Sequence, residues 1–564
     1  MKKLFVLLTA MIALVLFLGA SLVASPPVAS STPVTSQILI VQAENADTAA
    51  SVVSEYGGTV KTELAIINAV SADVTAEQIA ALEADGRIAA LYTNGEAEVA
   101  QANPQNKPGP IGVNADFPQV MGADQVWDAG INGNDITVAV VDTGIARFGW
   151  NAERILATYD VLDGLNKYSQ DPHGHGSMMA SLIGSSMQDE NGPLGIAPAV
   201  DFVNVRVLDS EGKGTHADII DGLNWILANK DTYNIRVVNL SLISGIDGPY
   251  WANPLNQAVE ALWDAGIVVV AAAGNDGPDP LTIASPGNDP FIITVGSFTD
   301  NYTPADESDD YITPFSGAGP TETGFVKPDV VAPGAHMLVQ ARPDSAWALA
   351  NPDARIHGMY YQIAGTSASA AVTSGLVALM LEANPDMTPN QVKYALMDGA
   401  RPALDANGDL TWSIFQQGAG RVWAADAVLN PADGEANLGM IPGEPYVGPT
   451  VYRDGEFILV DEDGEPLADL AGYSWVGGYS WVGGYSWVGG YSWVGGYSWV
   501  GGYSWVGSTD WDDWTEEDVW QSGYSWVGGY SWVGGYSWVG GYSWVGGYSW
   551  VGGYSWVGIE AFDG

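Results

Sequence analysis

Three features of the sequence predict an α/β fold with a parallel sheet for residues 108–431. Apolar runs such as DITVAVVD, DFVNVRVL, IRVVNLSL and AGIVVVAAAG lack strict alternation, as strands buried on both faces do. Stretches with helical spacing lie between them, for example HADIIDGLNWILA and NPLNQAVEALWDA. Strands that alternate with helices form parallel sheets through right-handed crossovers, with helices on both faces. We therefore expect the active site at the carboxyl ends of the strands.

Residues 37–99 predict a small α+β domain of the split βαβ, ferredoxin-like type. QILIVQ, AIINAVSADV and RIAALYTN are strand-like, whereas NADTAASVVSEYG and TAEQIAALEADG have helical spacing. Thr75, followed three residues later by Gln78, gives a capping-box signature at the start of the second helix.

The N-terminus has the composition of a targeting signal. Two lysines precede a long apolar run that ends in small residues, which predicts a signal peptide over residues 1–25 and a secreted, extracellular protein. The run is also long enough to cross a bilayer, so an uncleaved anchor is the alternative.

Composition excludes several classes of function. The 564 residues carry a net charge of −47, with only 19 Lys and Arg, and such a surface repels nucleic acid. The sequence has no cysteine, which excludes disulfides and cysteine-ligated metals. Its many carboxylates suit calcium.

Two motifs place candidate catalytic groups in the first half of the α/β region. Asp142 ends the strand VAVVDTGI, and Asp-Thr-Gly is also the core of aspartic proteases. A second such triplet is missing from the sequence, although a homodimer would supply one. His173 and His175 begin a predicted helix, either as loop residues or as a pair of metal ligands.

Two further motifs lie in the second half. Asn275 follows a buried strand in VVVAAAGNDG, where an amide either caps a turn or donates to a developing oxyanion. Ser367 opens the apolar helix in GTSASAAVTSG. Serine there is commonly an N-cap, but a nucleophile would gain from the helix field and from free backbone N–H groups.

Together with KPDVVAPG (327–334), these motifs resemble the subtilase family of serine proteases, in the family's order Asp, His, Ser. The resemblance covers about 300 residues. It implies that Ser367 is the nucleophile, that His175 rather than His173 is the general base, and that Asp142 orients it. It also implies that Asn275 is an oxyanion donor.

The same resemblance implies a peptide-binding cleft. SEGKG (210–214) and NLSLIS (239–244) would pair with an extended substrate, and Ala272-Ala273-Gly274 would form a pocket wall for a sizeable apolar side chain. The expected substrate-binding residues are Gly212, Gly214, Ser241, Leu242, Ala272, Ala273 and Gly274. The sequence departs from the family pattern at ARFGWNAER after Asp142, at Ile243 in place of Gly and at Ala371 in place of Pro.

By resemblance, residues 37–99 are an inhibitory propeptide whose end lies in the active site and is cut within about 98–110, so that the zymogen matures itself. MQDENGPLG (187–195) lies where many subtilases carry a calcium loop, with Asp189 and Asn191 as the expected ligands of a structural calcium. DANGD (405–409) resembles part of a calcium loop. No cofactor is expected to be required for the chemistry.

The C-terminal part reads as an acidic linker (432–472) followed by hexapeptide repeats (473–558). Twelve copies of YSWVG, interrupted by an acidic insert at 508–523, predict either short β-strands with Gly-Gly turns or a disordered tail. Rows of Tyr and Trp suit stacking on a polysaccharide, on a cell envelope or on another copy, so association with the cell surface is a further expectation.

The sequence thus predicts a secreted serine endopeptidase that acts on polypeptides and is inhibited by its own propeptide. The alternative is a catalytically inactive surface or adhesion protein that keeps the fold as a scaffold and binds through its aromatic repeats.

Overall fold

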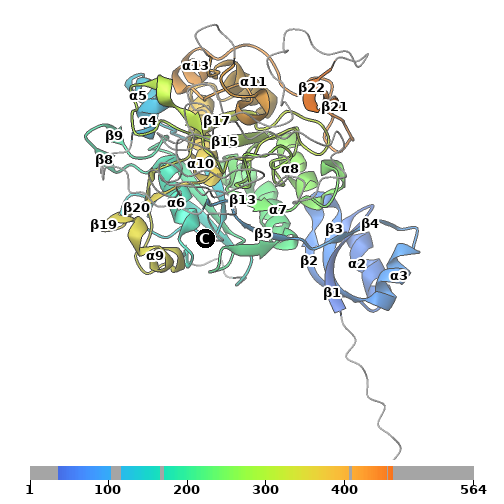
Figure 1. The fold of residues 1–564 in the computed structure, drawn as a ribbon. Coiled ribbons are helices and arrows are strands. Elements are labelled where there is room, and N and C mark those ends of the chain that lie inside the picture. The colour runs from blue at the N-terminus through green and yellow to red at the C-terminus, as the bar shows by residue number, and fades with distance from the viewer. Residues whose placement is uncertain (1–35, 103–115, 165–169, 405–409, 454, 461–564) are drawn as a thin grey trace, which may run out of the picture.

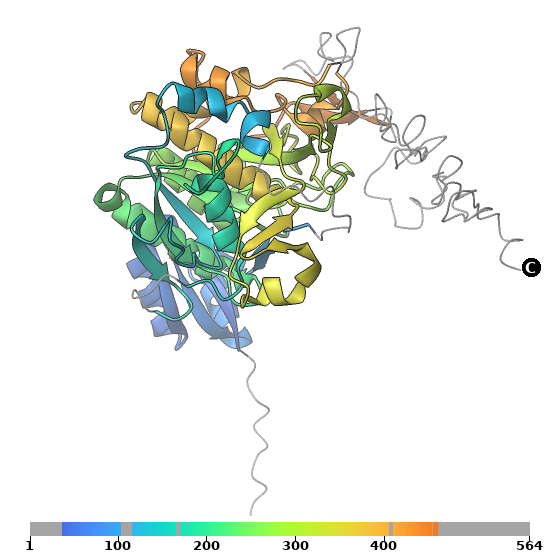
Figure 2. The same ribbon diagram turned by 90° about the vertical axis from the view of Figure 1, so that its left-hand side faces the viewer.

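The structure, a computed structural model, describes residues 36–102, 116–164, 170–404, 410–453 and 455–460 (Figure 1). The predicted signal peptide, the DANGD loop and the repeat tail lie outside the described residues. A small N-terminal α+β domain and the C-terminal helices α11 (Pro389–Asp398) and α13 (Ala424–Leu429) lie at opposite ends of a large α/β domain (Figures 1 and 2).

The N-terminal domain is a four-stranded antiparallel sheet with two helices. Its strand order is β2-β3-β1-β4, the order of a ferredoxin-like fold. The strands alternate between two environments: Leu39 and Val41 pack with the domain's own helices, whereas Ile40 joins the core of the large domain. The elements are β1 (Ser36–Ala43), α2 (Ala46–Glu55), β2 (Thr59–Leu64), η1 (Ala65–Ile67), β3 (Ala69–Thr75), α3 (Ala76–Glu83) and β4 (Ile88–Thr93).

One strand prediction in this domain is wrong. AIINAVSADV does not form a single strand, because Ala65–Ile67 make a 3₁₀ turn and Asn68 adopts a left-handed conformation with φ of 56° before β3 begins. The sequence analysis also missed β2, whose exposed positions are polar. Both predicted helices are present, and Thr75 and Gln78 form the predicted capping box.

The large domain contains an eight-stranded, mostly parallel sheet, which confirms the predicted fold class. The order along the sheet is β16-β15-β14-β12-β6-β10-β7, and β17 pairs in parallel with β15. The edge strand β16 is antiparallel to β15. The strands are β6 (Thr137–Asp142), β7 (Ile155–Asp160), β10 (Asp201–Arg206), β12 (Ile235–Leu240), β14 (Val268–Ala272), β15 (Ile293–Thr299), β16 (Tyr311–Ile312) and β17 (Val330–Pro333).

Helices cover both faces of this sheet. α6 (His175–Gly184) and α10 (Thr366–Ala383) pack together on one face, and α7 (His216–Tyr233) and α8 (Pro254–Asp264) pack together on the other (Figure 1). Among the described helices, α10 alone is long and apolar enough to cross a membrane, and 89% of it is buried inside the fold. It is therefore the central helix of the core, and its first turn is held rigidly.

Smaller elements connect this framework. They are α4 (Phe117–Val120), α5 (Ala123–Asp128), β8 (Gln188–Asp189), β9 (Gly192–Pro193), η2 (Tyr250–Ala252), η3 (Glu307–Asp309), β18 (Met337–Gln340), α9 (Ala346–Ala350), η4 (Pro352–Ala354), β19 (Arg355–His357), β20 (Tyr360–Ile363) and α12 (Ile414–Gln417).

The N-terminal domain docks on α7 and α8. The backbone N–H of Ile66 donates to Asn224 Oδ1 at 3.0 Å. Gln42 Nε2 donates to Gln257 Oε1 at 2.9 Å, and Gln257 Nε2 donates to the Tyr92 hydroxyl at 3.1 Å. Side-chain amides at this interface therefore add specific attachment to the apolar contact made by Ile40 and its neighbours.

The segment after Pro431 remains packed on the large domain as far as residue 460, although composition suggested a linker there. The backbone N–H of Gly443 donates to the Glu260 carboxylate, and that of Tyr446 donates to the Tyr250 hydroxyl at 3.0 Å. Strands β21 (Thr450–Arg453) and β22 (Glu456–Leu459) then pair with each other. We call the described residues 432–453 and 455–460 the C-terminal strap.

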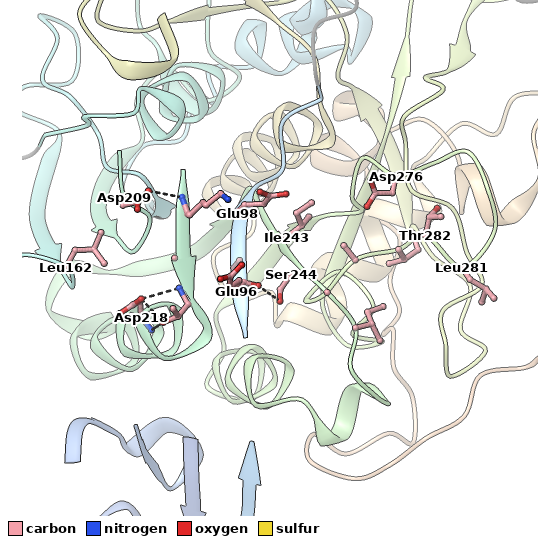
Figure 3. Close-up of a pocket in the computed structure, with 18 residues that line it drawn as sticks. Glu96, Glu98, Leu162, Asp209, Asp218, Ile243, Ser244, Asp276, Leu281 and Thr282 are labelled. Carbon is pink, nitrogen blue, oxygen red and sulfur yellow. Dashed lines mark hydrogen bonds between the residues drawn. The ribbon is translucent and has the colours of Figure 1, made fainter. Parts of the chain in front are cut away.

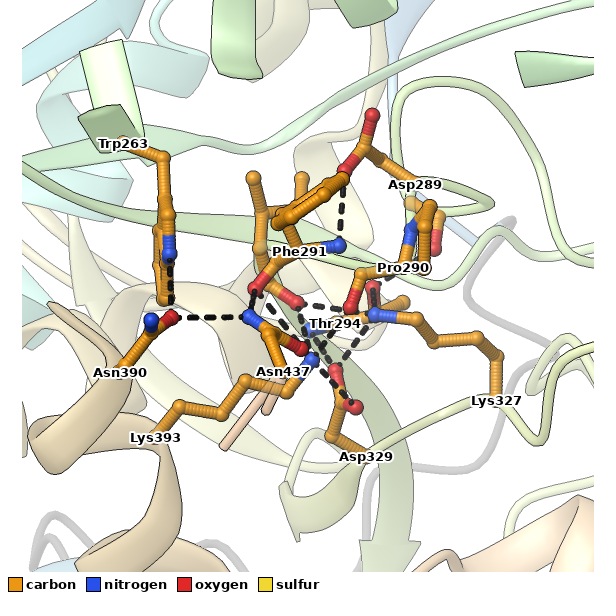
Figure 4. Close-up of polar contacts among 12 residues, drawn as sticks. Trp263, Asp289, Pro290, Phe291, Thr294, Lys327, Asp329, Asn390, Lys393 and Asn437 are labelled. Carbon is orange, nitrogen blue, oxygen red and sulfur yellow. Dashed lines mark hydrogen bonds and ion pairs between the residues drawn. The ribbon is translucent and has the colours of Figure 1, made fainter. Parts of the chain in front are cut away.

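A buried ionic cluster fastens α11 to the base of the sheet (Figure 4). Asp329, which immediately precedes β17, receives hydrogen bonds from Lys327 Nζ at 2.7 Å and lies 3.0 Å from Lys393 Nζ of α11. All three side chains are at most 5% exposed. Burial disfavours ionisation, but the two lysines hold the pKa of Asp329 below its ordinary value.

We expect Asp329→Ala to lower the free energy of unfolding by about 3–5 kcal/mol, because it leaves two buried lysines without their shared carboxylate. Asp344 supplies a matched control, because it forms an exposed ion pair with Arg342: the Asp344 side chain is 68% exposed and that of Arg342 is 54% exposed. Asp344→Ala should cost no more than about 1 kcal/mol. Urea unfolding measures both, and equal costs would contradict a structural role for the buried cluster.

Candidate active site

Four elements deliver the predicted catalytic residues to the carboxyl edge of the sheet. Asp142 is the last residue of β6, and His175 is the first residue of α6. Asn275 lies three residues beyond the end of β14, and Ser367 is the second residue of α10. Asp142, His175 and Ser367 have no exposed surface in the structure. The four residues thus come from the ends of rigid elements, as a precise site requires.

The imidazole of His175 is paired with the Asp142 carboxylate. His175 Nδ1 lies 2.9 Å from both carboxylate oxygens, and Asp142 Oδ1 also accepts from the backbone N–H of Thr143 at 2.7 Å. A carboxylate on Nδ1 selects the tautomer that carries its proton there, which leaves the lone pair on Nε2. His175 Nε2 and Ser367 Oγ are both buried and have no hydrogen-bond partner within the described part of the chain. His175 is therefore equipped to act as a general base through Nε2.

Two hydrogen-bond donors surround the reacting position. Asn275 Oδ1 accepts from the backbone N–H of Thr366 at 3.0 Å and from its hydroxyl at 3.1 Å. These contacts fix the amide so that its Nδ2 faces away, and this buried donor has no partner among the described residues. The backbone N–H of Ser367 donates to the carbonyl oxygen of Ala100 at 3.1 Å. Donors of this kind stabilise a developing oxyanion.

Gly365 lets the chain approach the nucleophile closely. Its φ of 152° lies in the region that favours glycine. A Cβ at this position would lie 2.9 Å from the Ala100 carbonyl oxygen, 3.0 Å from the Ala102 nitrogen and 3.1 Å from Ser367 Oγ. The three atoms therefore converge on the space that a side chain at Gly365 would fill.

A strand from the end of the N-terminal domain occupies the cleft. β5 (Glu96–Val99) pairs antiparallel with β11 (Lys213–Thr215) on one side and with β13 (Leu242–Ser244) on the other. Val99 N donates to Gly212 O and Ala100 N donates to Ser241 O, each at 3.0 Å. Gly214 and Leu242 lie in the flanking strands. Four of the predicted substrate-binding residues, Gly212, Gly214, Ser241 and Leu242, thus surround one extended chain.

Ala272, Ala273 and Gly274 are buried at the end of β14, and Gly274 N donates to Thr366 Oγ1 at 3.2 Å. The residue whose carbonyl meets Ser367 is the small Ala100. The sizeable apolar side chain expected in this pocket concerns the substrate and stays a prediction. A cavity of about 740 Å³ lies along β5, lined by residues that include Ile243, Leu281 and Ala284 (Figure 3).

Two further histidines lie in the cleft. Burial lowers the pKa of both His173 and His216 to about 4. The rings of His173 and His175 are 6.3 Å apart, and among the described residues no group of three His, Cys, Asp or Glu is placed to hold a metal ion. The sequence analysis missed His216, whose Nε2 lies 2.6 Å from Ser244 Oγ; that hydroxyl donates to Glu96 O at 2.8 Å. Its position at the start of a helix beside the predicted cleft strand SEGKG was the only available signal.

The predicted calcium residues lie in the β8–β9 hairpin. Asp189 Oδ1 accepts from Asn191 N at 2.7 Å, and Asn191 Nδ2 donates to Asp116 Oδ1 at 3.3 Å. Calcium takes six to eight oxygen ligands, so these side chains would be only part of a site. Calcium therefore stays a prediction.

Comparisons with known proteins identify the family of the large domain. The profile of the Peptidase_S8 subtilase family matches residues 133–420. The serine protease AprX of Bacillus subtilis (strain 168) is 38% identical over 304 residues, which are 53% of this chain and 67% of that protein. Subtilisin DY of Bacillus licheniformis is 30% identical over 280 residues, 49% of this chain and 88% of that protein.

A solved structure shares the fold. Fervidolysin from Fervidobacterium pennivorans, described as a keratinolytic enzyme related to subtilisin, aligns with a TM-score of 0.55 and 21% identity over 70% of this chain. The alignment spans 61% of the fervidolysin chain. Residues 133–420, which match the family profile, contain β6, α6 and α10, the elements that carry three of the candidate residues.

Proposed function

This chain belongs to the subtilase family of serine proteases, and on that premise we propose that it is an endopeptidase made as a self-processing zymogen. Its substrates are polypeptides, and its catalytic residues are Asp142, His175, Ser367 and Asn275. The observation that carries the proposal is the hydrogen bond from Ser367 N to Ala100 O, because it holds a peptide carbonyl at the nucleophile.

The chemistry follows from the hydrogen-bond donors and acceptors of the site. His175 Nε2 takes the proton of Ser367 Oγ as that oxygen attacks the carbonyl carbon, and Asp142 stabilises the resulting imidazolium. The carbonyl oxygen becomes an oxyanion that accepts from Ser367 N and Asn275 Nδ2. The imidazolium then protonates the leaving amine. Water, deprotonated by His175, hydrolyses the acyl-enzyme and restores Ser367.

The N-terminal domain acts as the inhibitor in this proposal. Its strand β5 occupies the cleft, and its sheet is attached separately to α7 and α8. Because the carbonyl at the nucleophile belongs to Ala100, the bond cut during maturation is Ala100–Gln101, within the expected region. In this proposal β5 is bound in the cleft as a substrate before the cut and stays there as a product after it.

Export and attachment complete the proposal. The signal segment at residues 1–25 would direct secretion, and the aromatic repeats at 473–558 would bind a polysaccharide or cell-envelope component. A structural calcium held with the help of Asp189 and Asn191 would stabilise the secreted enzyme. The inactive-scaffold alternative is disfavoured because all four expected catalytic groups are present, His175 is paired with Asp142, and Asn275 is held by Thr366.

The enzyme function is tested with a serine-directed fluorophosphonate on the matured protein. We expect labelling at Ser367, because His175 Nε2 is free to activate its hydroxyl. The control is Ser369→Ala, which removes a hydroxyl that donates to Ala332 O at 3.1 Å and should leave the label in place. Absence of label at Ser367 in a folded, matured protein would favour the inactive scaffold.

Maturation is tested by N-terminal sequencing. The wild-type chain should yield a mature protein that begins at Gln101, and Ser367→Ala should remain uncut there when produced in a host without other proteases. A Ser367→Ala chain that still matures at Gln101 would show that another protease makes the cut.

The role of the repeats is tested with a chain that ends at residue 460, which retains the C-terminal strap. It should hydrolyse a small soluble peptide as fast as the full chain, because every catalytic contact lies before residue 370. It should lose retention on an insoluble polysaccharide or envelope fraction that holds the full chain. Equal retention of both chains on every fraction would argue against an attachment module.

A further inference from the structure

Asp171 is a buried carboxylate close to the catalytic pair that the reaction does not use. It is 5% exposed and lies four residues before His175. Its Oδ1 accepts from Thr143 Oγ1 at 2.8 Å and from Gly174 N at 2.6 Å. Its Oδ2 accepts from Ser177 N at 2.8 Å and from Ser177 Oγ at 2.7 Å. One side chain thus satisfies four donors from two separate segments.

The direction of these hydrogen bonds requires an ionised carboxylate. Thr143 Oγ1 accepts from Gly176 N at 3.0 Å, and Ser177 Oγ accepts from Ala146 N at 2.9 Å. Each hydroxyl therefore has its single proton left to give to Asp171. Burial raises the pKa of Asp171, but the four donors oppose that rise. Asparagine would place an NH₂ against one of these donors.

The network joins the two halves of the catalytic pair. On one side, Thr143 follows Asp142, and its N–H donates to the Asp142 carboxylate at 2.7 Å. On the other side, Gly174 and Gly176 flank His175 at the start of α6. The segments touch so closely that a Cβ on Gly176 would overlap the carbonyl oxygen of Gly144. The relative position of imidazole and carboxylate therefore depends on the contact that Asp171 fastens.

We propose that Asp171 is a positioning residue that sets the geometry of the hydrogen bond between His175 Nδ1 and Asp142. The expected loss of activity rests on the proposed function. The expected change in the hydrogen bond between His175 and Asp142 rests on the contacts alone. Asp171→Asn should lower kcat about 10²-fold on a small peptide, as misplaced reacting groups do, and leave KM unchanged. The pKa that limits kcat/KM on the acid side should fall, because the imidazolium loses stabilisation.

A spectroscopic test separates this inference from the proposed function. In the full chain with Ser367→Ala, proton NMR should show the low-field resonance of the His175 Nδ1 proton in its hydrogen bond to Asp142. Adding Asp171→Asn should shift or abolish that resonance. Activity is not needed for this readout, so an inactive wild type would count against the proposed function and leave the positioning role open to confirmation.

Glu382→Gln is the matched control. Glu382 accepts from Asn132 N at 2.6 Å, from Gly133 N and from Asn134 Nδ2 at 2.8 Å, and it packs a loop outside the catalytic pair. The control should lower the thermal midpoint without moving the resonance, kcat or the pH profile. The same changes in both variants would show that Asp171 contributes only to general stability and would overturn the proposal.

If the Asp171→Asn protein does not fold, Thr143→Val is a second variant that tests the same network. It removes one link of the network and keeps the side-chain volume, so it should shift the resonance in the same direction and by less, with a smaller loss of kcat. A folded Thr143→Val or Asp171→Asn protein with an unchanged resonance and an unchanged pH profile would overturn the positioning role.

Discussion

The pairing of His175 with Asp142 is the contact on which the rest of the site depends. Both side chains are fully buried, and His175 Nδ1 is equidistant from the two carboxylate oxygens at 2.9 Å. Taking a charge out of water costs several kcal/mol, so this arrangement survives only where the surroundings hold it. The fold does so by placing Asp142 at the end of a central strand and His175 at the first position of a buried helix. Neither element can move without disturbing the core, and the pair inherits that rigidity.

Two other buried carboxylates in the large domain are stabilised in opposite ways, and their distance from the catalytic pair explains the difference. Asp329 is compensated by two lysines at the far end of the sheet. Asp171, beside His175, is compensated by neutral donors alone, two backbone N–H groups and two hydroxyls. A lysine in place of the neutral donors around Asp171 would repel the imidazolium that the proposed reaction forms on His175. Neutral donors fix the geometry without opposing the charge that the reaction creates.

The sequence predicted the parts of the molecule that carry a local signal. Continuous apolar runs revealed β6, β10, β12 and β14, and short motifs predicted the four candidate residues that the structure places at the carboxyl edge of the sheet. The missed parts depend on distant partners. The four residues of β5, EAEV, alternate polar and apolar side chains over too short a stretch to predict a strand by themselves. They pair with β11 and β13, which lie more than 100 residues away. The C-terminal strap attaches through backbone N–H groups such as those of Gly443 and Tyr446, which leave no mark in the sequence. AIINAVSADV was misread because the left-handed Asn68 interrupts an apolar run.

In the proposed zymogen, the way β5 is bound would allow one cleft to hold first an inhibitor and later a substrate. Main-chain pairing with β11 and β13 does not depend on which side chains the bound strand carries. The side chains of Glu96 and Glu98 in β5 are exposed. Any extended polypeptide can make the same ladder. What distinguishes the chain's own strand is its second attachment, because Gln42 and Ile66 of the same domain bind α8 and α7. After a cut at Ala100 this attachment keeps the local concentration of β5 high, whereas a cleaved substrate has no such anchor and leaves. Inhibition in the proposed zymogen therefore depends on the docking of the N-terminal sheet on α7 and α8. The cleft binds the inhibitor and a substrate through the same main-chain contacts.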